Sequence, residues 1–578
     1  MMNKRTIIAI ILTFIVVFGW SIIQSKFFPP APVQEAKKEV TPSAEKKTEI
    51  KETIEPKEMK TPPRRPVVTA KKEVSVETQN YWAVFTSEDA RLKHFRLKKY
   101  MDRVEESVVT IKLLRFVKGL LGYKFEEPKK PAPLDLVNTT EEEGLPLGLS
   151  FDKVRPSSEL EGYWAVDKEG LSLVKDGEKG EIVFVKTLEN GLKVSKRYRL
   201  SAEEETFDLE VEVHNPSPAE IATQVGLEWV GRVELKKLAD EGNKDFGLRY
   251  NFLKNQKVET KDLAGASGGG CTPGCQSQKT SVEPFEITEK GEIGWYSFGG
   301  EYFAAMLISP PSEKNMTLAA SGNEKGIVRA NLAAAPVSIP SQQSVKMVYR
   351  VYMGPKEAGR LKALGAGAEK LVDFGYFDIV AKPLLWFLKL TNTVTKNYGI
   401  DIILISILIK IIFLPLTQIS MKSMKEMQKV QPEMARLKET YKNDKARLQQ
   451  EIMLLYKRRK INPMSGCLPM LIQIPVFIAL YNALQNSIEM RHAPFFLWIQ
   501  DLAAKDLIYV TPIIMGASMV LQQKMTPTAA DPAQAKMFLL MPIMFTFLFL
   551  SFPSGLVLYW LVNNVLSIAH QYYMNKKA

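Results

Sequence analysis

Cysteine and histidine are rare in this sequence, which has 3 Cys and 4 His among 578 residues. Three Cys exclude a disulfide-stapled scaffold. The four His are far apart in the chain, and none belongs to an H-E-x-x-H helix, so we expect no metal site. No Gly-x-x-x-x-Gly-Lys-Ser/Thr loop occurs, and nothing else indicates ATP or GTP binding. We therefore predict a protein without a cofactor and without enzymatic activity.

One short string matches a catalytic motif by its letters alone. Residues 265–269 read Gly-Ala-Ser-Gly-Gly, which fits the nucleophile elbow. That elbow requires a buried strand before it and a helix after it. The neighbouring residues are more Gly and a Cys-Thr-Pro-Gly-Cys stretch, which indicates a loop. Within it we favour a disulfide between Cys271 and Cys275, with free thiols as the alternative.

The overall composition conceals two different kinds of segment. With 24% charged and 46% hydrophobic residues, the chain is neither wholly disordered nor fibrous. A mean hydropathy of −0.10 argues against a protein that is membrane-embedded from end to end. Several windows are nevertheless almost purely apolar, and the net charge is +13. This pattern predicts a chain divided between aqueous and lipid-embedded parts.

The first 80 residues show an apolar run followed by a polar one. Residues 6–23 are uncharged, follow Lys4 and Arg5, and precede no small-x-small cleavage site. We interpret residues 1–25 as a transmembrane anchor, with a secretory signal as the alternative. Residues 26–80 are rich in Pro, Lys and Glu, and no aromatic residue occurs from 29 to 80. Such a segment buries too little apolar surface to fold, so it predicts a disordered linker.

Residues 81–370 change to short stretches in which apolar and polar residues alternate. Examples are Phe207 to Val213 and Val345 to Val351. Asn190-Gly191 lies between two such stretches and is a strong hairpin signal. We predict a large antiparallel β-sandwich domain, whose topology the pattern leaves open.

After residue 371 the sequence predicts a helical membrane core. Aromatic residues and lysines mixed over 371–396 indicate a helix in the membrane interface, with a solvated helix packed on the β domain as the alternative. Apolar windows near the roughly 20 residues that a bilayer requires then follow at about 398–417, 467–487, 507–523, 537–551 and 555–573. With the N-terminal anchor they make six spans, five of them in the core.

Loop charges orient these spans. Residues 419–466 carry twelve Lys/Arg against five Asp/Glu. The positive-inside rule puts this loop and both termini in the cytoplasm, and the β domain in the periplasm of a bacterium with two membranes. Within the loop, residues 419–460 read as two amphipathic helices. Their charge suits an anionic partner: lipid, ribosomal RNA or an acidic protein.

The most informative residue is Lys410, which lies inside an apolar window. A lysine at the centre of a span costs about 2.5–3.5 kcal/mol on insertion scales. No Asp or Glu lies in the interior of another span, so we expect a hydrated cavity open to the cytoplasm, with snorkelling of Lys410 as the alternative. Polar residues of the spans that are candidates for its lining are Ser406, Gln473, Gln522, Gln523, Asn563 and Asn564.

Three motifs resemble the YidC/Oxa/Alb family of membrane protein insertases. They are Asn462-Pro463-Met464-Ser465-Gly466-Cys467-Leu468-Pro469, then Ala493-Pro494-Phe495 with Leu497-Trp498-Ile499, then Phe552-Pro553-Ser554-Gly555-Leu556. The resemblance covers about 371–573 closely. Trp295 to Leu307 is the best stretch of the β domain, which resembles the Gram-negative form more loosely.

The resemblance implies a hydrophilic groove with one positive residue that attracts acidic segments of a nascent protein. The groove residue is usually Arg, and this chain has Lys410. We assign the substrate groove to Lys410, Ser406, Gln473, Phe477, Tyr559 and Trp560, and the cytoplasmic receiving loops to Lys422, Lys425, Lys429, Arg458, Arg459 and Lys460. Implied partners are nascent membrane proteins, the Sec translocon, the ribosome and membrane lipids, with no specific DNA. The competing hypothesis is a secondary transporter or channel subunit, although no internal repeat supports it.

Overall fold

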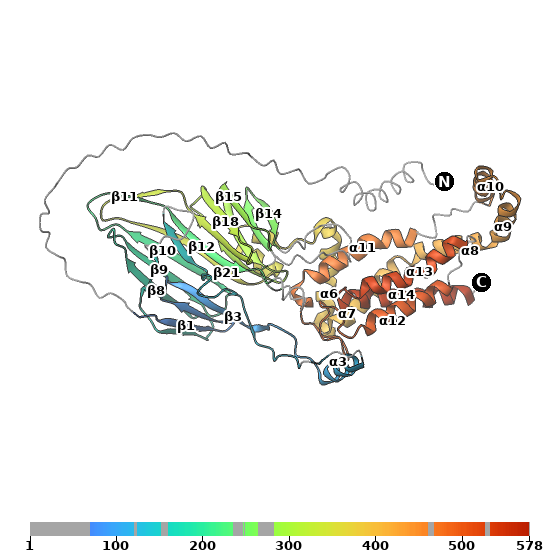
Figure 1. Cartoon of the computed structure of the whole chain (residues 1–578), viewed down its shortest axis with the longest axis horizontal. Helices are drawn as coiled ribbons and strands as arrows, with labels where there is room; N and C mark the ends of the chain where they lie inside the picture. The colour runs from blue at the N-terminus through green and yellow to red at the C-terminus, as the bar shows by residue number, and fades with distance from the viewer. Residues whose placement is uncertain are drawn as a thin grey trace. The chain divides into compact units, whose positions relative to one another are not determined.

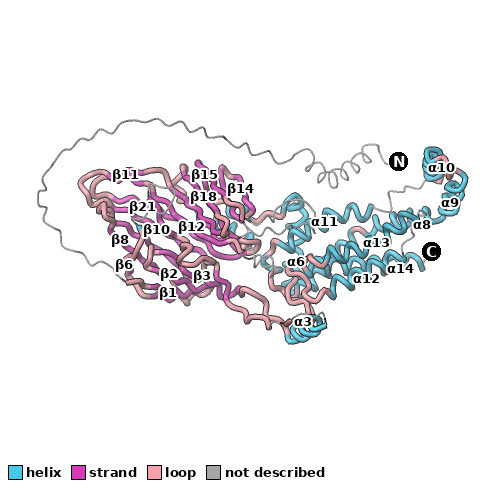
Figure 2. Tube along the Cα trace, viewed as in Figure 1, coloured by secondary structure: helices cyan, strands magenta, loops and turns pink. Residues whose placement is uncertain are grey.

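A computed structural model describes residues 70–576, except 121–123, 126, 152–159, 235–244, 246, 248, 264–281, 460–467 and 526–531. The expected N-terminal anchor, most of the expected linker, the elbow-like string and all three Cys lie outside the described residues. The strands of the described residues lie between residue 73 and residue 355, and a series of helices follows from residue 358 (Figure 2).

The β part contains four sheets, drawn with their strand labels in Figure 1. One has the order β4-β3-β2-β1-β7, the largest β14-β13-β16-β17-β21-β10-β9-β8-β6, and the others β11-β20 and β15-β18-β19-β12-β5. The strands are β1 (Glu73–Thr78), β2 (Tyr81–Thr86), β3 (Arg91–Met101), β4 (Pro133–Asp135), β5 (Gly148–Phe151), β6 (Ala165–Val166), β7 (Gly170–Leu173), β8 (Lys179–Thr187), β9 (Lys193–Ser201), β10 (Thr206–His214), β11 (Ile221–Thr223), β12 (Val225–Arg232), β13 (Arg249–Lys254), β14 (Lys257–Asp262), β15 (Phe285–Gly291), β16 (Ile293–Gly299), β17 (Phe303–Ile308), β18 (Met316–Gly322), β19 (Ile327–Ala333), β20 (Val337–Ile339) and β21 (Ser344–Pro355).

The alternating sequence patterns form strands as predicted. Strands β8 and β9 flank Asn190-Gly191, and Gly191 has a φ of +88°, a conformation that glycine adopts without strain. In β10, Phe207, Leu209 and Val211 are buried, as the alternation requires. One apolar cluster joins these residues to residues of the other large sheets, such as Phe85 and Leu332, so the sheets share a core.

The predicted linker is wrong for its last residues. Residues 73–78 read Glu-Val-Ser-Val-Glu-Thr and form β1, which pairs antiparallel with β2 and parallel with β7. Val74 and Val76 are buried in the core. The absence of aromatic residues misled the prediction, because two alternating valines are enough to anchor an edge of a sheet that other strands complete.

The helices of the described residues follow the β part, apart from α3 (Val108–Leu120), which lies between β3 and β4. They are α5 (Ala358–Leu364), η3 (Ala368–Leu371), η4 (Gly375–Phe377), α6 (Asp378–Thr395), α7 (Tyr398–Ile412), α8 (Leu414–Lys429), α9 (Gln431–Thr440), α10 (Lys445–Arg458), α11 (Leu468–Gln485), η6 (Ile488–Met490), α12 (Val510–Met525), α13 (Pro532–Phe549) and α14 (Ser554–Lys576). A helix therefore lies at each apolar window after residue 398.

The expected continuous helix over 398–417 is wrong, because it breaks at Phe413. Pro415 lies at the second position of α8, where it lacks an N–H and disfavours helical backbone at Leu414. Taken singly, no helix in the described part is both long and apolar enough to cross a membrane. Tyr398–Ile412 and Leu414–Met427 meet that requirement together and are bent by 59°.

The charged loop contains the predicted helical hairpin, with different bounds. Helices α9 and α10 pack through a small apolar cluster of Val430, Met434 and Leu455. Asp444 caps α10 by accepting a hydrogen bond from the Arg447 N–H at 2.9 Å. The segment 419–429, expected in the hairpin, instead belongs to α8, because α8 runs on from the break at Phe413.

Candidate functional site

Lys410 lies near the end of α7 and has one hydrogen-bond partner. Its Nζ donates to the Ser567 Oγ of α14 at 2.6 Å, and that hydroxyl donates to the Asn563 carbonyl. Among the residues that the structure describes, no carboxylate forms an ion pair with Lys410. The ammonium has three donors, so a single hydroxyl leaves two of them available to water or to a bound anion.

Three other predicted groove residues lie on the same helices or reach them. The Tyr559 side chain is fully buried on α14, two turns before Ser567, and the Gln473 Nε2 of α11 lies 3.5 Å from its Oη. Ser406, one turn before Lys410, is buried and donates to the Ile402 carbonyl of its own helix. Its hydroxyl is therefore occupied within α7 and is not offered to a ligand.

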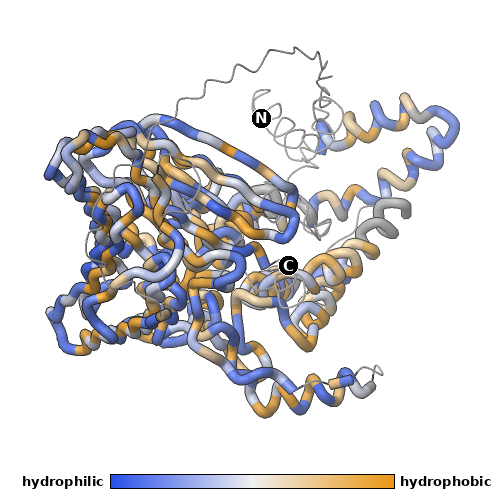
Figure 3. Tube along the Cα trace, turned by 60° about the vertical axis from the view of Figure 1, so that its left-hand side comes forward, coloured by the Kyte–Doolittle hydropathy of each residue, from blue (hydrophilic) through white to orange (hydrophobic). Residues whose placement is uncertain are grey.

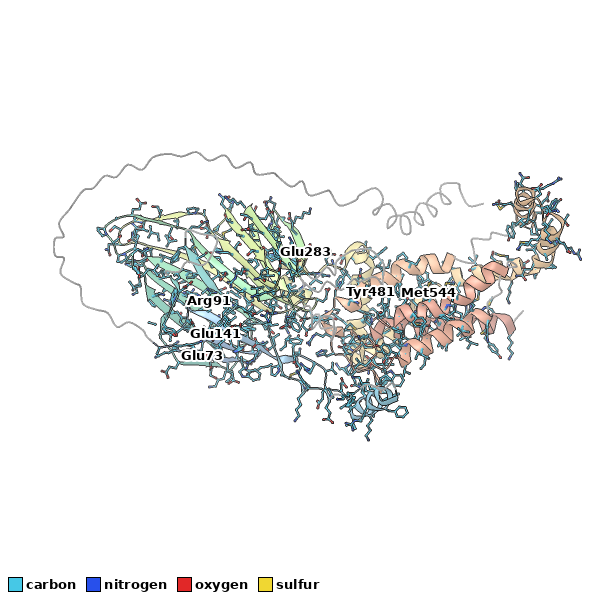
Figure 4. The ribbon with its side chains drawn as sticks, viewed as in Figure 1. Glu73, Arg91, Glu141, Glu283, Tyr481 and Met544 are labelled. Atoms are coloured by element: carbon cyan, nitrogen blue, oxygen red, sulfur yellow. The ribbon has the colours of Figure 1, made fainter. Side chains whose placement is uncertain are left out.

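Phe477 and Trp560 belong to an aromatic cluster at a different face of α14. Their ring centroids are 5.2 Å apart in an edge-to-face arrangement, and Phe549 of α13 lies 5.1 Å from Trp560. Figure 4 labels two neighbours in this part of the molecule, Tyr481 of α11 and Met544 of α13. The six predicted groove residues thus divide into a polar group around α7 and α14 and an aromatic group between α11, α13 and α14.

The residues of the sequence motifs meet at the other end of α7. The Asn397 side chain caps α7 and donates to the Phe495 carbonyl at 3.2 Å. A Cβ at Gly399 would lie 2.0 Å from the Phe495 ring, so only glycine fits there. The Ser554 N–H donates to the Ala504 carbonyl at 2.7 Å. This end of the helix group is closed by direct contacts, about 18 Å along α7 from Lys410 at 1.5 Å per residue.

Of the predicted receiving residues, most are exposed and two are held by acidic neighbours. Lys422 and Arg458 are exposed, and Lys429 forms an ion pair with Glu426 at 2.8 Å. Arg459 pairs with Glu433 of α9. Lys425 donates to the Met574 carbonyl of α14 at 2.8 Å, and Lys460 lies outside the described residues.

Sequence reasoning missed Ser567 and the buried ion pair of Arg491. Ser567 follows Tyr559 and Asn563 at four-residue spacing, which was the available signal for a polar stripe on one helix face. Arg491 forms a two-pronged pair with Asp245, at 2.5 and 2.6 Å, and donates to the Met101 carbonyl at 2.7 Å. Both side chains are less than a tenth exposed. No local pattern links residues 246 positions apart.

Two ionisable groups of the same loop have shifted pKa values. Burial raises the pKa of Asp501 from 3.8 to about 6, although N–H groups of Ala503 and His492 donate to its carboxylate. Burial, helped by the charge of Arg491, lowers the pKa of His492 to about 3. His492 is therefore neutral at physiological pH, whereas the Asp501 carboxyl titrates near physiological pH.

Two family models together match most of the chain. The 60Kd inner membrane protein family matches residues 389–578, and the YidC periplasmic domain matches residues 117–387. The boundary between the two matches falls inside α6. The two models thus describe separately the helical and the strand-rich parts of the chain.

Full-length relatives give the same grouping. The chain is 39% identical to the membrane protein insertase YidC of Syntrophus aciditrophicus, over all of both chains. It is 37% identical to that of Geotalea daltonii, over all of this chain and 99% of the other. Among solved structures, an active YidC insertase crystal structure matches 88% of this chain and 93% of its own, with 20% identity and a TM-score of 0.36.

Proposed function

The chain belongs to the YidC family of membrane protein insertases, and we propose that it inserts newly made proteins into the bacterial inner membrane and assists their folding. One observation carries the mechanism. Lys410 is a cation in an apolar helix whose partner is a neutral hydroxyl, so its charge is not cancelled locally. A charge in this setting attracts anions over a longer range than one that is already paired.

We infer the following sequence of events. Asp and Glu residues of a client's translocated segment enter from the cytoplasm and are drawn toward Lys410. Water shares the coordination of the ammonium and of the incoming carboxylates, which lowers the cost of bringing charge into the membrane. The contacts around Asn397, Gly399 and Ser554 keep the opposite end closed, so ions do not leak through while a segment is held.

The client's apolar segment leaves sideways along exposed apolar helix faces. Ile411 and Ile412 of α7 are 61% and 62% exposed, and Phe547 of α13 is 69% exposed. Exposed apolar surface of this extent is unfavourable in water and matched by lipid tails. The orange helical segments in Figure 3 follow the same part of the chain. We propose that α7, α11, α12, α13 and α14 are the core spans and that residues 6–23 form a sixth.

The topology and the partners are assigned from the charges of the loops and from the family. The α9–α10 hairpin and α8 face the cytoplasm, where exposed Lys422 and Arg458 receive the ribosome or the anionic surface of a client complex. The β part lies in the periplasm, α6 lies in the membrane interface, and the Sec translocon is a partner for larger clients. Both chain termini are cytoplasmic in this topology.

Depletion of the chain tests the function. A small, newly labelled membrane protein is followed in spheroplasts treated with external protease. We expect its translocated segment to become inaccessible to protease when the chain is depleted, and accessible again when the chain is restored from a plasmid. Equal accessibility with and without the chain would reject the proposal. A transporter would instead lose uptake of a solute while the client is inserted normally.

A further inference from the structure

Helix α3 is an excursion from the β part that exposes large apolar side chains. It occupies Val108–Leu120 between β3 and β4. Val108, Val109 and Phe116 are 67%, 55% and 69% exposed, whereas the strands around the helix bury their apolar residues. The tube of this helix, at the bottom of Figure 3, alternates between apolar and polar residues along the chain. A helix that is only a structural brace would have turned these side chains inward.

The sequence of α3 places three apolar residues on one arc and three basic residues on the arc beside it, with Val108 among the basic residues. At 100° per residue, Val109, Leu113 and Phe116 fall within one arc of about 60°. Lys112, Arg115 and Lys118 fall on the adjoining arc, and all three are exposed. Residues 108–130 carry six Lys/Arg and two Glu, so the excursion has a net charge of +4. An apolar edge bordered by cations is complementary to a bilayer surface with anionic headgroups.

The base of the excursion is fixed at a loop of the helical core. Asp102 and Ala132 form a backbone hydrogen bond of 2.8 Å, and the Ala132 N–H also donates to the Asp102 Oδ1 at 2.9 Å, which joins the two ends. The neighbouring Met101 carbonyl accepts a hydrogen bond from Arg491, which lies between α11 and α12. In the proposed topology that loop is at the outer membrane surface. The fixed base therefore keeps α3 within reach of the lipid headgroups.

We propose that α3 docks on the periplasmic surface of the inner membrane. Phe116 and Val109 enter the boundary between headgroups and acyl chains, and Lys112, Arg115 and Lys118 contact anionic phospholipid headgroups. The Phe125 ring lies 5.2 Å from the Arg115 guanidinium and 5.8 Å from the Lys118 ammonium, which holds both cations at the same side of the helix. The β part then has its own attachment to the membrane in addition to the covalent link through α6.

The test uses the full chain in lipid nanodiscs, with its three Cys replaced by Ser and one NBD fluorophore attached. The probe site is Phe116→Cys, and the matched control is Val174→Cys, which is an exposed apolar position in the same β part. The nanodiscs contain nitroxide-labelled lipid, with or without phosphatidylglycerol. We expect strong quenching at position 116 in anionic nanodiscs and little at position 174. No insertion activity is required, so this readout is independent of the proposed function.

Charge variants complete the test. Each removed cation should lower the equilibrium constant for docking about fivefold, so Lys112→Glu, Arg115→Glu and Lys118→Glu together should abolish quenching at position 116. The control reverses three exposed lysines elsewhere in the β part, Lys175, Lys179 and Lys193, and should change nothing. Two results would overturn the proposal. One is equal quenching at positions 116 and 174; the other is quenching at 116 that ignores both the lipid charge and the triple reversal.

Discussion

Two lysines, one fully buried in the β part and one half-buried in the helical part, are held in opposite ways. Lys196 of β9 is fully buried and donates to the Ala90 and Leu147 carbonyls, with the Tyr198 ring 5.5 Å away. Lys410 of α7 donates to one hydroxyl. Burial lowers the pKa of Lys196 well below its usual value, and the two carbonyls hold the side chain in a fixed place.

The charged residues of the two parts differ in the same way as the two lysines. In the β part, Arg91, labelled in Figure 4, pairs with the Glu228 carboxylate at 3.0 Å, and both side chains are mostly buried. Glu73 and Glu141, also labelled, pair with Lys93 nearer the surface, at 2.6 and 2.8 Å. The helical part leaves its central cation without an acid among the described residues. A satisfied buried charge specifies a structure, whereas an unsatisfied one is available to a client.

The largest expected effect is that of Lys410→Ala on acidic clients. Removing this charge should lower the insertion of clients with Asp and Glu about tenfold or more, because one attractive contact of this kind amounts to about 1.5–3 kcal/mol. Lys410→Arg supplies the same charge and should keep activity. Insertion of one client in acidic and neutralised versions measures the effect. Equal loss for both versions in the Ala variant would give Lys410 a structural role.

Lys196→Ala should affect stability and leave the chemistry of insertion alone. The change takes the lysine donor from the Leu147 carbonyl, leaves the Ala90 carbonyl with the Tyr198 hydroxyl alone, and opens a cavity, so we expect about 2–4 kcal/mol lower stability of the β part. Pulse proteolysis of the full chain in urea measures it. The exposed Lys179→Ala is the matched control and should have no effect. Unchanged resistance in the Lys196 variant would contradict the structural role.

The loop that joins the two parts should show a pH-dependent stability through Asp501. Its folded pKa of about 6 exceeds the ordinary 3.8, so the folded state holds this proton more tightly than the unfolded state. The resulting penalty is absent below about pH 4, grows between about pH 4 and pH 6, where the unfolded carboxyl is ionised and the folded one is not, and levels off at about 3 kcal/mol above pH 6. Asp501→Asn should therefore stabilise the chain at pH 8 and not at pH 4. Urea unfolding at both pH values decides the matter, and an equal effect at both would contradict it.

The smallest expected effect on insertion comes from removing the β part. Deleting residues 90–340, the choice that the sequence suggests, would remove both neighbours of β21 and the outer neighbours of the β1–β2 pair, which leaves unpaired strand edges. Deletion of residues 70–356 removes those strands altogether. The added Arg491→Met removes the cation that would otherwise lose its partner Asp245. Insertion of a small client should remain within about threefold of normal. This corresponds to less than about 1.4 kcal/mol, the free-energy difference that changes a rate tenfold. Complete loss in a stably expressed deletion would show that the two parts act together.

Local patterns predicted the elements, and long-range contacts account for what they missed. Alternation identified β10 and β21 as strands, yet nothing local says that Phe207 pairs with Val351. Charge and hydropathy found Lys410, because an ionised residue in an apolar window is costly. They missed Ser567, because a serine in an apolar helix is common and its partner is 157 positions away. Pro415 was a visible signal for the break after α7. The prediction did not use it, because the span was taken from the length of the apolar window.

The strand order of the largest sheet also constrains when this domain can finish folding. Strand β21 is the last strand of the β part, and it lies between β17 and β10, so it joins the two halves of the nine-stranded sheet. Pairing of such distant segments is slow, because the entropy cost of closing a long loop comes before any stabilising contact forms. In the proposed topology the β part is exported, so the two halves remain separate sheets with open edges until residue 355 has crossed the membrane. Under that topology the domain completes its fold only after its whole length has been translocated.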